Sequence, residues 1–145
     1  MCPHVAASYN NVGNSLGELG RHEEALELEQ KALQLRVKFF GEEHPSVATS
    51  YNNVAITHFK VRDYKKAILH IQKSYALYNT LFHNAHPDSV NTCLYYLHFL
   101  LHINRVPQAM KILKDKMQKI KTLEKEQKVP TYMIANALDE LKSFE

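Results

Sequence analysis

Glycine, proline and cysteine are scarce in this sequence of 145 residues, and tryptophan is absent. Four glycines and five prolines are too few for a collagen-like or low-complexity chain. Two cysteines, Cys2 and Cys93, cannot build a disulfide framework or a thiolate metal site. No run of about 18 apolar residues is present, and the first residues lack the pattern of a signal peptide. We therefore expect a cytoplasmic protein without a membrane span.

The motifs of catalysis are also missing. The nine histidines include His98 and His102, whose i, i+4 spacing on a helix would let both bind one metal ion. A zincin requires glutamate directly after the first histidine, and Phe99 stands there instead. We find no glycine-rich phosphate loop and no nucleophile elbow. The sequence thus predicts no enzyme, no cofactor and no metal site, and a small metal-dependent enzyme is the least favoured alternative.

A long internal repeat is the main positive signal. Residues 3–44 and 45–86 align without a gap and share 14 identities, most of them in the segments 3–12 and 45–54. A third, more divergent copy covers residues 87–128. Such a period indicates stacked units, each of which buries an apolar face of its neighbour. We interpret residues 1–145 as a single domain that contains these three units.

Each unit is expected to be a helical hairpin. Pro45 and Pro87 suit the first position of a helix, and apolar residues then recur at spacings of three and four. Gly20 separates the two helices of the first unit, and the second helices should bury Ala25 and Ala67 against the first. The sequence therefore predicts an all-α fold of seven helices. They form hairpins at 3–41, 45–83 and 87–128, followed by a capping helix at about 131–144.

The residues within each unit resemble the tetratricopeptide repeat. The matching residues are Tyr9, Val12, Gly13, Leu16 and Ala25 in the first unit, Tyr51, Val54, Ala55, His58, Ala67 and Ile71 in the second, and Cys93, Tyr96, Leu97, Leu100, Ala109 and Leu113 in the third. Glu29 and Leu97 depart from the pattern, and His58 is a polar exception in its apolar stripe.

The repeat length, which is the interval from Pro3 to Pro45, and the linker at 39–45 are similar to the kinesin light chain subclass of this repeat. The resemblance implies a right-handed α-solenoid of about three hairpins whose first helices line a concave groove. It also implies a scaffold that binds an extended, acidic peptide with an aromatic anchor. A regulatory or oligomerising array within a larger signalling protein is the alternative.

The expected groove residues lie about half a turn from the packing stripe of each first helix. They are Asn10, Asn14, Asn52, Asn53, Ile56, Phe59, Lys60, Asn91, Tyr95, His98 and His102. Asparagine both donates and accepts hydrogen bonds, so it can hold a peptide backbone of any sequence. The same amides could instead bond to neighbouring helices and stabilise the stack. Both interpretations stay open at this stage.

Charge is unevenly distributed along the chain. Residues 3–44 carry a net charge of −3, whereas 45–86 and 87–128 each carry +4. A lysine run between 111 and 128 contains no aromatic residues that could stack on bases, so we interpret it as a solvated outer face. The expected partner is therefore a protein or peptide of unknown identity, and neither nucleic acid nor a membrane. The chain could also belong to a longer repeat array.

Overall fold

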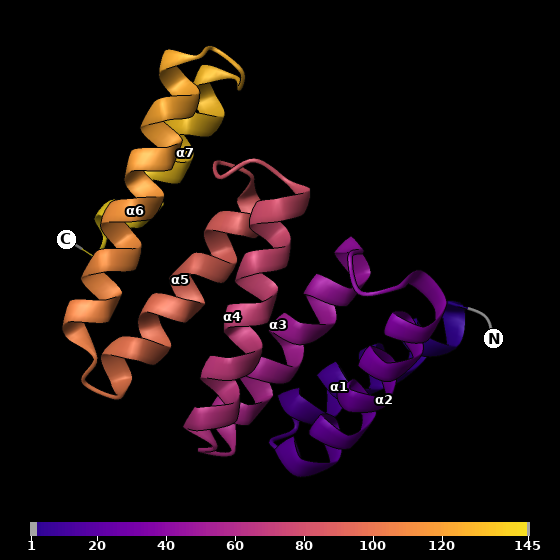
Figure 1. The fold of residues 1–145 in the computed structure, drawn as a ribbon. Coiled ribbons are helices and arrows are strands. Elements are labelled where there is room, and N and C mark those ends of the chain that lie inside the picture. The colour runs from indigo at the N-terminus through magenta and orange to yellow at the C-terminus, as the bar shows by residue number, and fades with distance from the viewer. Residues whose placement is uncertain (1–2, 145) are drawn as a thin grey trace. The chain divides into compact units, whose positions relative to one another are not determined.

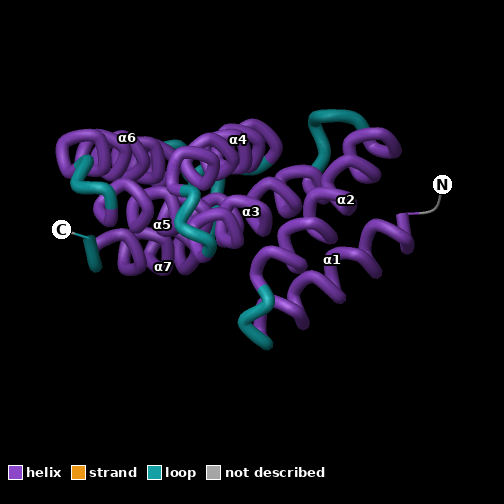
Figure 2. The backbone as a smooth tube through the Cα atoms, turned by 90° about the horizontal axis from the view of Figure 1, so that it is seen from below, coloured by secondary structure: helices purple, strands orange, loops and turns teal. Residues whose placement is uncertain are grey.

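The computed structural model describes residues 3–144, which form seven α-helices and no strand (Figure 2). Their bounds are α1 Pro3–Glu18, α2 His22–Phe40, α3 Pro45–Lys60, α4 Tyr64–Leu81, α5 Pro87–His102, α6 Val106–Lys125 and α7 Thr131–Lys142 (Figure 1). The predicted all-α fold of seven helices is confirmed, while the second helices of the hairpins end at Phe40, Leu81 and Lys125, before the predicted 41, 83 and 128. The chain divides into two compact units, Met1–Leu77 and Tyr78–Glu145. The single domain over 1–145 stays a prediction.

The linkers between hairpins are fixed by a repeated histidine contact. The Nδ1 atom of His44 accepts a hydrogen bond of 3.0 Å from the backbone N–H of Ser46, which caps the start of α3. The same ring stacks on Phe40, with 4.0 Å between the ring centroids. His86 caps α5 in the same way and stacks on Phe82 at 4.2 Å. Neither histidine contact was predicted from the sequence.

The turn inside each hairpin keeps the period of the sequence repeat. Gly20 has a φ of 79°, and the equivalent residues Arg62 and Asn104 have φ values of 65° and 62°. This left-handed conformation is natural for glycine and strained for most other residues. Since Arg62 and Asn104 nevertheless adopt it, the turn geometry is imposed by the packing of the helices on either side. The third hairpin therefore keeps the register of the first two.

Small residues allow the helices of the first unit to approach closely. Ala25 and Ala67 are fully buried, as the sequence predicted. A Cβ atom added to Gly13 would lie 3.0 Å from Cγ of Glu29 and 3.3 Å from the carbonyl oxygen of Ala25. A larger side chain at position 13 would therefore require the Glu29 side chain or the backbone at Ala25 to shift. The Oγ atom of Ser74 donates a 2.8 Å hydrogen bond to the carbonyl oxygen of Ala48, which joins α4 to α3.

In the second unit, α7 packs against α6 and α5. Its buried face consists of Ile134, Ala137 and Leu141, while Leu138 and Phe144 are half-buried. The helix ends at Lys142, and Phe144 follows in a turn. This segment thus takes the capping position that was predicted for residues 131–144.

Candidate partner-binding site

Two of the predicted groove asparagines bond to each other in the first unit. The Nδ2 atom of Asn53 in α3 donates a 3.0 Å hydrogen bond to Oδ1 of Asn10 in α1. Asn10 is only 8% exposed, whereas Asn14, one turn later, is exposed. The bond joins the first helices of two successive hairpins. Asn10 and Asn53 therefore support the stack, and Asn14 is the more accessible amide.

Replacing Asn53 by alanine is expected to lower the free energy of unfolding by about 1 kcal/mol, because Oδ1 of the nearly buried Asn10 loses its donor. The measurement is urea unfolding followed by circular dichroism. Asn14→Ala is the matched control, and since Asn14 is exposed it should leave the unfolding midpoint unchanged. An equal effect of the two substitutions would show that the Asn10–Asn53 bond contributes nothing to the stack.

The other predicted residues of the first unit lie along α3 with graded exposure. Asn52, Ile56 and Phe59 are half-buried, and Lys60 is exposed. The ring of Phe59 packs against Tyr64 at the start of α4, with 5.1 Å between the ring centroids. This contact holds the ring of Phe59 against the start of α4.

A surface cleft brings together the predicted residues of the second unit. It has a volume of about 280 Å³ and is lined by Asn91, Leu94, Tyr95 and His98 of α5 and by Phe144 after α7. Asn91 and His98 are exposed, and Tyr95 is half-buried. His102, one turn beyond His98, is exposed but does not line the cleft. Phe144 had been assigned only to the cap, because the sequence gives no sign that the chain end returns to α5.

Polar residues stand at two core positions of the first unit. Glu29 is 4% exposed, and burial raises the pKa of its carboxyl group, although a hydrogen bond from Thr57 acts in the opposite direction. His58 is 2% exposed, and neither of its ring nitrogens has a hydrogen-bond partner among the described residues. Burial and the nearby ring of His70 lower the pKa of His58. The sequence had already marked both residues as exceptions to the repeat pattern.

The sequence profile of the tetratricopeptide repeat matches residues 4–80, more than half of the chain. The chain belongs to the tetratricopeptide repeat family. No curated protein matches the sequence significantly. Among solved structures, the chain is similar to BtubC (BKLC) from P. vanneervenii, with a TM-score of 0.77 and 16% identity. That match covers 99% of this chain and 57% of BtubC, so this tetratricopeptide chain spans little more than half of that relative's length.

A protein from Podosopora anserina, named as a putative kinesin light chain with nearly identical TPR-like repeats, is similar as well. It has a TM-score of 0.70 and 15% identity, and the match covers 99% of this chain and 74% of that one. At these identities the likeness shows the fold alone. The fold is that of the kinesin light chain-like type of tetratricopeptide array, as the repeat length had implied. Tetratricopeptide arrays are interaction scaffolds for other proteins and are typically not enzymes.

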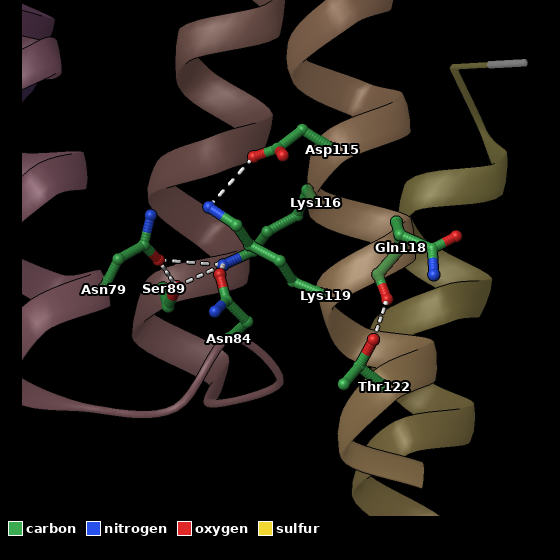
Figure 3. Close-up of polar contacts among 8 residues, drawn as sticks. All are labelled: Asn79, Asn84, Ser89, Asp115, Lys116, Gln118, Lys119 and Thr122. Carbon is green, nitrogen blue, oxygen red and sulfur yellow. Dashed lines mark hydrogen bonds and ion pairs between the residues drawn. The ribbon is translucent and has the colours of Figure 1, made fainter. Parts of the chain in front are cut away.

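One lysine of the tetratricopeptide array does not lie on the solvated outer face that was predicted for the lysines between 111 and 128. Lys116 was counted with the solvated lysines of α6, but its side chain is fully buried. Its Nζ atom donates hydrogen bonds of 3.0 Å to Oδ1 of Asn79 and to Oδ1 of Asn84, and a further bond to Oγ of Ser89 (Figure 3). Burial lowers the pKa of Lys116 to about 8. This ammonium group ties α6 to the end of α4, the linker and the start of α5.

No three histidine, cysteine, aspartate or glutamate side chains within residues 3–144 lie close enough together to hold a metal ion. None of the described helices is both long and apolar enough to cross a membrane.

Proposed function

We propose that this array binds an extended peptide of a partner protein and that the cleft on α5 receives an aromatic side chain of that peptide. The array would act as a scaffold and carry out no chemistry of its own. The cleft between α5 and Phe144 carries the proposal, because four kinds of side chain meet there in one open site. It offers an aromatic wall, an apolar floor, an amide and an imidazole.

The residues that line the cleft have separate roles in this proposal. Tyr95 and Phe144 would pack against the aromatic ring of the peptide, and Leu94 would exclude water from it. The exposed amide of Asn91 would donate to and accept from the peptide backbone. A volume of about 280 Å³ suits one large side chain and is too small for a folded element. The site therefore fits a short linear segment better than a folded partner.

The net charge of the second and third repeats favours an acidic peptide. Residues 45–86 and 87–128 each carry a net charge of +4. The predicted residues Lys60, His98 and His102 are all exposed, so their positive or protonatable groups are accessible to a ligand. An excess of positive charge raises the encounter rate with an acidic segment and lowers it with a basic one. Since few repeats are available, we expect a dissociation constant of about 1 μM, or about 8 kcal/mol.

Selection from a random peptide library on the immobilised chain tests this proposal. The enriched peptides should contain one aromatic residue flanked by aspartate or glutamate, and their binding should weaken as salt is added. Enrichment of basic peptides, or of peptides without an aromatic residue, would contradict it. A parallel selection on Tyr95→Ala separates peptides that bind at the cleft from those that bind elsewhere.

A further inference from the structure

The outer face of α1 has the same residue types as a face of α3 that is buried. Val5, Tyr9 and Val12 of α1 correspond, one repeat later, to Val47, Tyr51 and Val54 of α3. In α3 these three residues are 0%, 9% and 0% exposed, and α2 of the preceding hairpin packs against α3. In α1, Val5 is 43% exposed and Val12 is 51% exposed. The α1 face thus repeats a face that in α3 packs against the second helix of the preceding hairpin. No helix among the described residues takes that place on α1.

This face of α1 also forms an open apolar depression. It has a volume of about 260 Å³ and is lined by Val5, Ser8, Tyr9, Val12 and Leu28. Exposed apolar patches of this kind mark interaction surfaces more often than single exposed residues do.

The polar contacts around the face show what kind of helix it fits. Arg36 of α2 donates a hydrogen bond of 2.8 Å to Oγ of Ser50 in α3 and another of 3.4 Å to the carbonyl oxygen of Ser46. Ser8 is the equivalent of Ser50, and it is exposed on α1. An arginine at the position of Arg36 would therefore find the same acceptors on α1.

The two tyrosines extend this match. The ammonium group of Lys73 lies 5.4 Å from the ring centroid of Tyr51, and Lys31 lies 5.9 Å from that of Tyr9. Tyr51 also donates a 3.5 Å hydrogen bond to the carboxylate of Glu42, which belongs to the linker after α2. Tyr9 therefore already has, in Lys31, the equivalent of the Lys73 contact within its own hairpin. The equivalent of the Glu42 contact would come from a preceding hairpin.

We infer that the α1 face, defined by Val5, Ser8, Tyr9 and Val12, docks the second helix of a further repeat hairpin of the same length. That helix carries alanine and arginine where α2 has Ala32 and Arg36. A second copy of this chain is not the occupant, because its own second helices are engaged. α2 packs on α3, Asn79 of α4 bonds to α5, and α7 packs on α6.

A chain extended by one hairpin tests this inference. A second copy of residues 3–44 replaces Met1 and Cys2 ahead of Pro3, so that the added His44 precedes Pro3 as the native one precedes Pro45. Val12→Asp in the original copy should lower the thermal midpoint of this extended chain by about 5 °C, because it places a charge in a buried face. In the chain without the extension, the same substitution at a half-exposed residue should shift the midpoint by less than about 1 °C.

Thiol labelling gives a second readout that does not depend on stability. Val12→Cys should react quickly in the unextended chain carrying Cys2→Ser, and at least tenfold more slowly in the extended chain. The remaining thiol, Cys93, is fully buried in both. Equal labelling rates, or an equal effect of Val12→Asp in the two chains, would overturn the inference. Dimerisation of the unextended chain that Val12→Asp abolishes would also overturn it, because a second copy would then be the occupant.

Discussion

Replacing Lys116 by alanine is expected to lower the free energy of unfolding by about 3–5 kcal/mol. The substitution removes a fully buried aliphatic stem and leaves a cavity in the second unit. It also removes the donor that Asn79, Asn84 and Ser89 share. The part-buried oxygens of Asn79 and Asn84 and the buried Oγ of Ser89 then have fewer hydrogen bonds, and a buried one left without a partner costs about 1–3 kcal/mol.

The matched control is Lys114→Ala on the same helix. Lys114 is exposed, so this change should alter the free energy of unfolding by no more than about 0.5 kcal/mol. Urea unfolding followed by circular dichroism measures both variants. Similar midpoints for Lys116→Ala and Lys114→Ala would show that the buried network is not formed in solution.

Lys116 also makes the free energy of unfolding depend on pH in the alkaline range. Its pKa is about 8 in the folded chain and about 10.5 in the unfolded chain. Between these values the unfolded chain binds a proton at this site and the folded chain does not, so this group makes stability rise with pH. The full rise is about 3 kcal/mol. We expect the difference in stability between wild type and Lys116→Met to grow in favour of wild type from about pH 8 to pH 10.5. A constant difference would contradict this.

Replacing His58 by leucine is expected to raise the free energy of unfolding by about 2–4 kcal/mol. The two equivalent residues in the other hairpins are Leu16 and Leu100, and Leu100 is fully buried. At position 58 an imidazole whose two nitrogens find no partner among the described residues occupies the same kind of site. Leucine removes that desolvation cost and adds apolar burial of about 1.5–3 kcal/mol.

The same substitution should reduce the sensitivity of the chain to acid. The pKa of His58 is lowered below its ordinary value of 6.5 by burial, so the unfolded chain binds a proton more readily than the folded one. This group leaves stability unchanged above pH 6.5 and lowers it as the pH falls from 6.5 through the lowered folded pKa. His58→Leu should therefore lose less stability than wild type between pH 7 and pH 5. His98→Leu is the control, because His98 is exposed. If His58→Leu is destabilising at pH 7, the burial of an unpartnered imidazole is not the cost we infer.

The fold could be predicted because its signals are local and repeated. Prolines at 45 and 87 mark where α3 and α5 begin, and the repeat period carries each boundary to the next hairpin. The caps made by His44 and His86 were not foreseen, because histidine is not among the usual capping residues and its stacking partner is known only from the structure.

The candidate site could be predicted only in part. Half-turn spacing placed Asn91, Tyr95 and His98 on one face, and the structure brings all three to the same cleft. Spacing along one helix cannot show which side chains meet between helices, so the bond between Asn10 and Asn53 was left open. The burial of Lys116 depends on oxygens from three separate segments. The lysine run along α6 does not indicate which of its members will meet them.

The affinity of a selected peptide for Tyr95→Ala tests the central claim most directly. Tyr95 forms the aromatic wall of the α5 cleft, and removal of such an anchor costs at least about 2 kcal/mol, or about 30-fold in the dissociation constant. Tyr132→Ala is the matched control, because Tyr132 is 66% exposed on α7 and does not line this cleft. The account predicts that Tyr95→Ala binds the peptide about 30-fold more weakly than wild type and that Tyr132→Ala binds it equally well. Equal affinity of wild type and Tyr95→Ala for a wild-type-selected acidic, aromatic peptide would place the partner-binding surface elsewhere on the array.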